Sequence, residues 1–203
     1  EGSMIRLISL LMAILFATTL TAASKDKKSL TELGKICFSE EGDPQVRVEA
    51  CDQARMEYFD QNAIEKALKA ATQACALRSE MACAFAGAVC LKKKDSHKAR
   101  AFYMEAYKIN EEHRDSPLGI NPYLAKTLYS ELAKMLLKGD GGPIDSKLAK
   151  TMFEQGCEVE DGKSCTGLGI VITSEATPDF PRAALFFNKA CDAGFGLGCF
   201  MLA

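Results

Sequence analysis

Apolar residues recur every three or four positions along most of the chain from residue 29 onward, as in Leu132, Met135 and Leu136. This spacing places them on one face of an α-helix. Short polar segments rich in Gly, Asp and Pro, such as 39–44 and 138–143, interrupt the pattern and predict turns. The chain is therefore expected to form ten helices, near residues 29–38, 46–59, 62–76, 80–93, 96–109, 121–138, 145–157, 162–173, 180–193 and from about 197.

Three pairs of cysteines lie at one fixed spacing, each partner eight residues after the other. A continuous helix would separate such partners by about 12 Å. A disulfide needs Cα atoms within about 7 Å. If the pairs are bonded, the chain must reverse between the partners, and each pair joins the two helices of a hairpin. The pairs are Cys75 and Cys83, Cys157 and Cys165, and Cys191 and Cys199.

The cysteine pairs belong to an internal repeat. The last two pairs are 34 residues apart, and residues 97–107 match the segments that precede the other cysteines. This additional copy has Tyr107 and Glu131 where cysteines are expected. Both members of one pair are thus missing together, which is what a bonded pair predicts.

Cys37 and Cys51 flank the turn at 39–44, and we pair them across a fourth hairpin. Cys90 is then left over, among small residues on the same helix face as Cys83. We interpret it as a free, buried thiol that behaves as a small apolar residue. An intermolecular disulfide or a redox role is the alternative.

The predicted fold class is all-α, an array of stacked antiparallel helical hairpins stapled by disulfides. A single hairpin cannot bury its apolar stripe, so adjacent repeats must stack to cover it. Gly87, Gly167 and Gly169 would let neighbouring helices approach closely. A closed four-helix bundle or a sheet would contradict this prediction.

The N-terminus has the pattern of a secretory signal peptide over residues 4–23. Residues 1–3 resemble a cloning scar, and Arg6 precedes an apolar run over 7–20 and the small residues 21–23. That run is shorter than the roughly 20 residues of a membrane-spanning helix, which is the alternative interpretation. If the segment is retained, we expect Met4–Leu20 to pack against a second chain or in a groove of the array, so an oligomer is possible.

Composition narrows the function classes. The 203-residue chain has a net charge of −2 and no long block of like charge, so a nucleic-acid partner is not expected. Nine cysteines behind a signal peptide indicate disulfides and an oxidising compartment. Metal binding by the cysteines is the rival interpretation, but no Cys-x-x-Cys occurs. No cofactor or metal is predicted.

Hairpins of about 34 residues, with alanine-rich helices ending in Ala-Cys, resemble the Sel-one-like repeat family. The cysteine spacing is similar to that of its disulfide-stapled branch, the Helicobacter cysteine-rich proteins. The resemblance covers residues 30–203 of a predicted domain 24–203. It implies a right-handed superhelical solenoid akin to tetratricopeptide arrays, in the periplasm or secreted. One departure is an insertion at 108–122, because Tyr107 and Glu131 are 24 residues apart where the three cysteine pairs of fixed spacing are eight apart.

A catalytic set is not evident in the sequence. Gly-x-Ser-x-Gly and His-Glu-x-x-His are absent. The resemblance also implies penicillin binding or weak β-lactam hydrolysis, as described for some members of the family. Enzymes with that activity need a Ser-x-x-Lys motif together with Ser-Asp-Asn and Lys-Thr-Gly motifs. The one Ser-x-x-Lys here is Ser24–Lys27, at the predicted processing point, and neither companion motif occurs. A non-enzymatic role is therefore predicted.

A rigid solenoid with an extended concave face suits a protein partner. The insertion is either a recognition loop or a spacer at the unstapled joint. The resemblance implies two kinds of partner: an envelope protein bound by a scaffold, or a type VI secretion effector neutralised by an immunity protein. The candidate partner-binding residues are Glu111, Glu112, His113, Arg114, Leu118 and Ile120.

Overall fold

The computed structural model describes residues 28–113 and 122–202, and over these residues it contains α-helices and no strand. The predicted scar and signal segment, and Arg114, Leu118 and Ile120 of the insertion, lie outside the described residues. The helices are α2 (Leu30–Cys37), α3 (Pro44–Asp60), α4 (Ile64–Ala76), α5 (Glu80–Lys92), α6 (Ser96–Glu112), α7 (Pro122–Lys138), α8 (Ser146–Glu158), α9 (Gly162–Thr173), α10 (Phe180–Asp192) and α11 (Gly196–Phe200).

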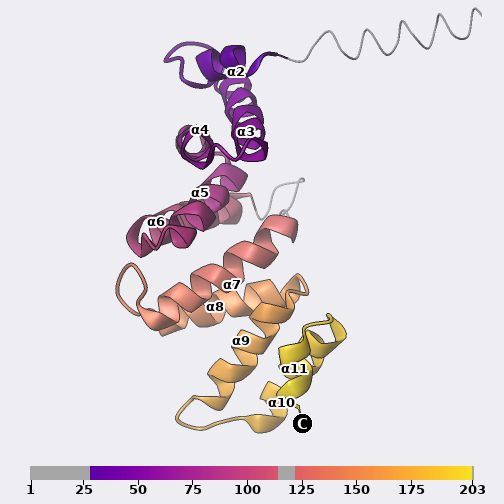
Figure 1. Ribbon diagram of the computed structural model, residues 1–203. Coiled ribbons are helices and arrows are strands. Elements are labelled where there is room, and N and C mark those ends of the chain that lie inside the picture. The colour runs from indigo at the N-terminus through magenta and orange to yellow at the C-terminus, as the bar shows by residue number, and fades with distance from the viewer. Residues whose placement is uncertain (1–27, 114–121, 203) are drawn as a thin grey trace, which may run out of the picture.

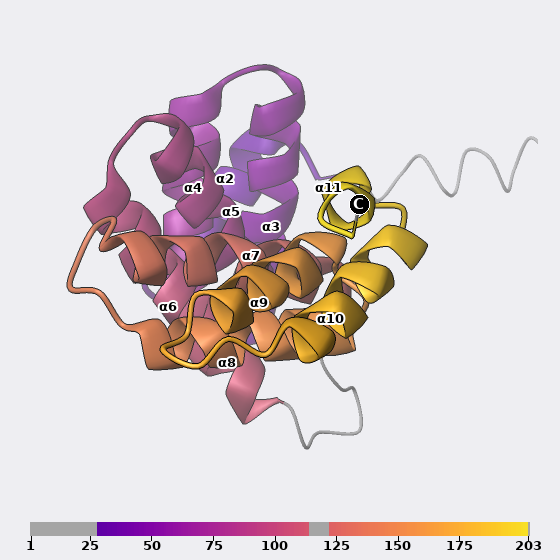
Figure 2. The same cartoon turned by 90° about the horizontal axis from the view of Figure 1, so that it is seen from below.

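The helices follow one another from α2 at one end of an elongated array to α11 at the other (Figure 1). Each helix packs against the next, and contacts of α5 with α7, α7 with α9 and α9 with α11 link successive hairpins. Seen from below, the N-terminal helices run at a large angle to the C-terminal ones (Figure 2), as in a superhelix. The predicted all-α solenoid of stacked hairpins is confirmed. No helix in the described ranges is long and apolar enough to cross a membrane.

Four disulfides staple neighbouring helices. They join Cys37 to Cys51, Cys75 to Cys83, Cys157 to Cys165 and Cys191 to Cys199, with Cα–Cα distances of 4.6–4.7 Å. These short distances are possible because the chain reverses between the cysteines of each pair. Cys90 is free and buried. Burial raises the pKa of its thiol, which keeps it protonated near neutral pH.

The turn within each eight-residue staple has the same geometry. The third residue after the first cysteine is left-handed: Arg78 at φ 74°, Glu160 at φ 59° and Gly194 at φ 77°. The next backbone N–H then bonds a carbonyl five residues back, for example Asp161 N to Gly156 O at 3.0 Å. This is the Schellman ending of a helix, in which glycine is preferred because it has no Cβ.

Replacing Glu160 by glycine should therefore stabilise the fold. A left-handed conformation costs an L-residue about 1–2 kcal/mol, part of which is lost again to the greater freedom of glycine in the unfolded chain. We expect Glu160→Gly to raise the free energy of unfolding by about 0.5–1 kcal/mol in chemical denaturation. Arg78→Gly is the matched control, and it should gain less because Arg78 pairs with Glu112. A destabilised Glu160→Gly variant would contradict this account of the turn.

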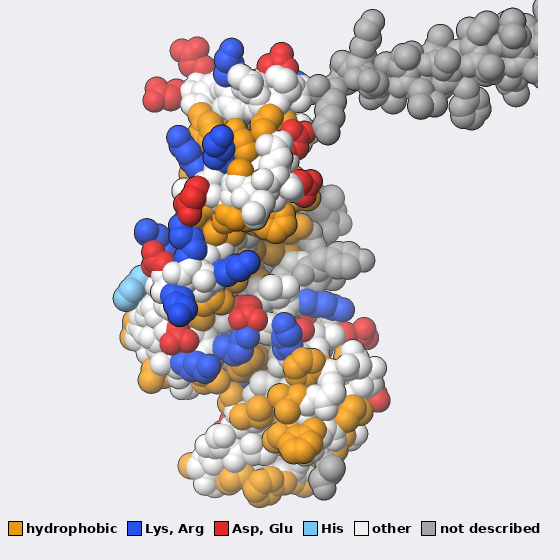
Figure 3. Space-filling view, viewed as in Figure 1, with side chains coloured by type: hydrophobic (Ala, Val, Ile, Leu, Met, Phe, Trp, Pro, Cys, Tyr) orange, Lys and Arg blue, Asp and Glu red, His pale blue; other side chains and the backbone are white. Residues whose placement is uncertain are grey.

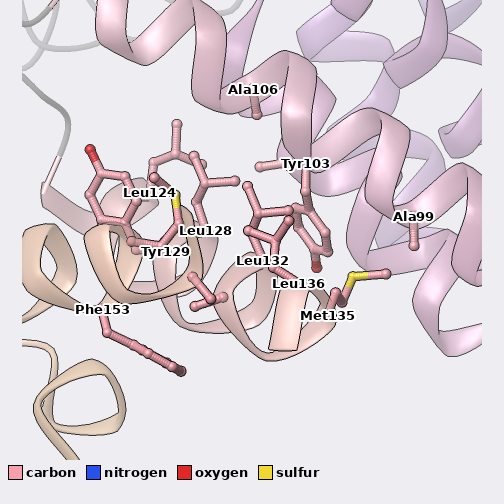
Figure 4. Packing of buried hydrophobic residues seen from close by; sticks show 14 of the residues in the cluster. Ala99, Tyr103, Ala106, Leu124, Leu128, Tyr129, Leu132, Met135, Leu136 and Phe153 are labelled. Atoms are coloured by element: carbon pink, nitrogen blue, oxygen red, sulfur yellow. The ribbon is translucent and has the colours of Figure 1, made fainter. Parts of the chain in front are cut away.

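The unstapled joint between α6 and α7 is held by side-chain packing. Tyr107 meets Tyr129 edge to face, with ring centroids 6.4 Å apart. The Tyr129 hydroxyl donates a hydrogen bond to Asn110 Oδ1 at 2.9 Å, and both residues are fully buried. Tyr103 packs in the same core among the leucines of α7 (Figure 4). An aromatic pair and a buried hydrogen bond thus occupy the joint where the other hairpins have a disulfide.

Two sequence-based boundaries were wrong. Residue Pro44 was assigned to a turn, but it is the first residue of α3, where its fixed φ suits a helix start and Asp43 caps the helix. The helix ending at 109 instead continues to Glu112, because Ile109 and Asn110 extend the buried stripe of α6. The start of the predicted insertion is therefore part of the core, and deleting it from residue 110 would cost stability.

The three glycines singled out in the sequence each lie against an aromatic ring of a neighbouring helix. A Cβ on Gly87 would lie 2.9 Å from Tyr103 Cδ1, and one on Gly167 would lie 2.4 Å from Phe153 Cε1. Gly169 meets Phe187 in the same way. All three distances are too short for a real Cβ, so the absence of a side chain is what allows these helices to pack closely.

Candidate partner-binding groove

An open, mainly apolar groove of about 450 Å³ lies between α7, α9 and α11. Its volume falls within the range of about 300–1,000 Å³ that is common for ligand sites. On the face shown in Figure 3, hydrophobic side chains gather over the C-terminal helices and Lys and Arg side chains over the middle of the array. We call this site the α7–α9–α11 groove. It is lined by Ser130, Lys134, Leu137, Lys138, Phe153, Lys163, Thr166, Gly167, Ile170, Phe195 and Leu197.

The floor of the groove depends on close packing between helices. Phe153 of α8 reaches it by lying over Gly167 of α9, and this residue is 3% exposed. Phe195, which precedes α11, lies against Gly162, where a Cβ would be 2.4 Å from the Cβ of Phe195. The ring of Phe153 and the Cβ of Phe195 are therefore packed against glycine positions of α9.

Two apolar side chains of the groove remain open to solvent. Ile170 is 41% exposed and Leu197 is 46% exposed. Side chains of this size gain free energy when they are covered, roughly 25 cal/mol per Å² of apolar surface. The exposed pair is the part of the groove that an incoming partner would bury.

The rim of the groove is positively charged. Lys134 and Lys138 of α7 and Lys163 of α9 line it, and no Asp or Glu is among the lining residues. Lys134 pairs with Glu131 on its own helix at 2.7 Å. The groove therefore combines an apolar floor with a cationic edge, in a chain whose net charge is −2.

Disulfides hold two of the three helices that form the walls, α9 and α11. The Cys157–Cys165 bridge ties α8 to α9, and the Cys191–Cys199 bridge ties α10 to α11. An ion pair between Lys150 and Glu175, at 2.6 Å, adds a link from α8 to the end of α9. The site is consequently built on fixed elements rather than on loops.

The described candidates from the insertion lie elsewhere. Glu111, Glu112 and His113 are at the C-terminal end of α6, and none lines the groove. Glu112 accepts a hydrogen bond from Arg78. His113 Nδ1 lies 3.7 Å from a carboxylate oxygen of Glu80, and the two form an ion pair when the histidine is protonated. Two of these side chains thus contact the stapled hairpin of α4 and α5.

Sequence reasoning missed the groove residues Lys134, Lys138, Lys163, Ile170 and Leu197. One signal was available in α9, where Leu168, Ile170, Val171 and Ile172 form an apolar run wider than a single buried stripe. A helix that is apolar on more than one side has a second face to cover. Ile170 belongs to that second face.

Two further depressions occur among the described residues. One of about 430 Å³ lies between α4 and α6 and includes Arg78, Phe102 and Glu105. Another of about 370 Å³ lies beside the Cys157–Cys165 bridge, with Glu158, Glu160 and Asp192 in its wall. Among the described residues, no three His, Cys, Asp or Glu side chains are grouped so that they could hold a metal ion.

Comparison with known proteins identifies a solved structure of the same fold and a curated protein that is similar over part of its length. No family model matches the chain. It is 33% identical over 128 residues to cytochrome c oxidase assembly factor 7 of Xenopus tropicalis, which covers 56% of this chain and 54% of that protein. The chain thus aligns with about half the length of this curated relative.

Among solved structures, a Sel1 repeat protein from Oxalobacter formigenes superposes with a TM-score of 0.58 at 16% identity, over 76% of this chain and 60% of that one. A putative Sel1 repeat protein from Klebsiella pneumoniae gives a TM-score of 0.35, too low to bear on the fold. The Oxalobacter superposition agrees with the stacked helical hairpins. The chain therefore has the fold of the Sel1 repeat proteins.

Proposed function

We propose that this chain is a non-enzymatic protein-binding scaffold and that the α7–α9–α11 groove is its principal docking site. The observation that carries the proposal is the open apolar groove with Ile170 and Leu197 at its surface. Repeat arrays of this kind present extended surfaces to partners. Exported location, in the periplasm or outside the cell, is part of the same proposal, supported by four disulfides and the signal-like sequence of residues 4–23.

Preorganisation supports a binding role. Association is opposed by the entropy lost when loops and side chains become ordered. Here Phe153 and Phe195 pack against glycines of α9, and the bridges tie α9 and α11 to their neighbouring helices. A partner would therefore meet a surface that is already in its bound shape.

The insertion is proposed as a second contact region. Glu111, Glu112 and His113 would form its described edge, and Arg114, Leu118 and Ile120 would extend it. The contacts of Glu112 with Arg78 and of His113 with Glu80 give this edge a fixed position beside the stapled hairpin.

The identity of the partner has more than one candidate. The partial relative is named as an assembly factor for cytochrome c oxidase. A role for this chain in the assembly of a respiratory oxidase is accordingly a second candidate, and recovery of oxidase subunits with the protein would support it. Neutralisation of a type VI effector is the immunity alternative, and it predicts a toxic partner encoded by a neighbouring gene.

Replacing Ile170 by aspartate should weaken partner binding at least about tenfold, because it removes an apolar contact and puts a charge in the groove. Partners recovered with the tagged protein from envelope extracts can be quantified by mass spectrometry, and the affinity then measured by titration. Stability should change by less than about 1 kcal/mol, since the side chain is partly exposed.

Leu185→Asp is the matched control. Leu185 is 63% exposed on α10 and does not line the groove, so the variant should keep its partners. If the Ile170→Asp variant recovers the same partners as the Leu185→Asp variant, the docking site is not in the α7–α9–α11 groove. Saturable hydrolysis of nitrocefin by the pure protein would replace the non-enzymatic proposal with the β-lactam alternative.

A further inference from the structure

The charge pattern of the α7–α9–α11 groove specifies the chemistry of its occupant. Three lysines and no carboxylate line it. Lys134 is already paired with Glu131, whereas Lys138 and Lys163 have no ion pair within the part of the chain that the structure describes. Both are exposed, so their charges are free to meet carboxylates that a partner brings. Electrostatic complementarity of this kind favours an acidic partner and raises its association rate.

The backbone chemistry of the groove favours a helical occupant. The described residues contain no strand, so the site offers no sheet edge to an extended peptide. The floor of the groove is formed by apolar side chains such as Phe153, Ile170 and Leu197, and it would leave the N–H and C=O groups of an extended segment without partners where they face it. A helix satisfies these groups internally and presents side chains at i, i+3, i+4 and i+7 to a groove.

We propose that the α7–α9–α11 groove binds an amphipathic helix of a partner protein, with aliphatic side chains on the floor and Asp or Glu side chains facing Lys138 and Lys163. This inference rests on the proposed scaffold function and adds the class of partner. The aliphatic face would cover Ile170 and Leu197. The acidic flanks would fix the orientation of the helix across α7 and α9.

The test uses three synthetic helical peptides of about 18 residues with leucines at the helical spacing. The first has glutamates flanking the leucine stripe, the second has lysines in their place, and the third keeps the glutamates but has alanine for leucine. Binding to the oxidised protein is measured by fluorescence anisotropy at low and high salt. The first peptide should bind at least about tenfold tighter than either of the others, and the difference from the lysine peptide should shrink in salt.

Variants separate this inference from the proposed function. The double variant Lys138→Glu/Lys163→Glu should lose about tenfold in affinity for the glutamate peptide and gain for the lysine peptide. Lys126→Glu/Lys147→Glu is the matched control, because it makes the same charge change at exposed lysines outside the groove. Circular dichroism should be unchanged in both, since all four lysines are exposed.

Three outcomes would overturn the inference. The glutamate and lysine peptides could bind equally well, neither could bind, or the double variant could bind the glutamate peptide as tightly as the wild-type protein does. In any of these cases, loss of native partners in Ile170→Asp would still leave the scaffold function standing. The groove could instead be occupied by a second copy of this chain, and analytical ultracentrifugation of the wild-type protein tests this by measuring its oligomeric state. A dimer that Ile170→Asp converts to a monomer would identify a second copy of the chain in the groove and would also overturn the inference.

Discussion

Reduction of the four disulfides is expected to unfold most of the array. Each bridge closes a loop with a sequence separation of 8 or 14 residues, which corresponds to about 2.5–3 kcal/mol in the chain-entropy model. Together they contribute about 10 kcal/mol, which is comparable with the entire stability of a typical domain, about 5–15 kcal/mol. We expect thermal melting followed by circular dichroism to show a cooperative transition for the oxidised protein and little helix for the reduced protein at 37 °C.

The order of reduction is a further expectation of the same experiment. Cys199 is exposed and Cys191 half-buried, whereas the cysteines of the other three bridges are buried. Thiol reagents need access to a sulfur. The Cys191–Cys199 bridge should therefore open first, as mass spectrometry after brief reduction and alkylation would show.

Paired variants test where the stabilisation resides. Cys75→Ala/Cys83→Ala removes an internal, buried bridge, and Cys191→Ala/Cys199→Ala removes the bridge to α11, a helix of five residues. The internal pair should cost more stability. Cys90→Ala in every variant prevents exchange with the free thiol. A reduced protein that melts at the same temperature as the oxidised protein would refute the assignment of stability to the staples.

Much of the fold follows from local features of the sequence. The fixed spacing of the cysteines requires a chain reversal, and the apolar spacing places helices on both sides of it. The joint missing both cysteines also behaves as its sequence indicates, because Tyr107 packs against α7 through Tyr129 and not through a bridge. These features were predictable since each depends on residues that are close in the chain.

The groove could not be predicted in the same way. Its floor combines Phe153 of α8, Ile170 of α9 and Leu197 of α11, which come from three helices. Their meeting depends on the stacking of successive hairpins, and nothing in the spacing of any one hairpin fixes it. The end of α6 was missed for a different reason: Asn110 is polar, and its burial depends on Tyr129 in the next helix.

Replacing Tyr103 by alanine should be the most damaging single change in the unstapled centre of the array. The side chain is 1% exposed and lies between α5 and α7 (Figure 4). Removing a buried aromatic ring leaves a cavity and costs about 3–5 kcal/mol. No disulfide ties α6 to α7, so the loss cannot be offset by a covalent link across this joint. Urea denaturation should show a lower midpoint with a similar slope.

Two companion variants separate packing from other effects. Tyr103→Phe keeps the ring and should lose far less stability than Tyr103→Ala. Gly87→Ala alone should be destabilising, because the new Cβ would lie 2.9 Å from the ring of Tyr103. In the double variant Gly87→Ala/Tyr103→Ala the Cβ occupies part of the cavity, so the loss should be smaller than the sum of the two single losses. Strict additivity, or equal losses in Tyr103→Ala and Tyr103→Phe, would show that the contact between Tyr103 and Gly87 does not hold α5 and α6 together.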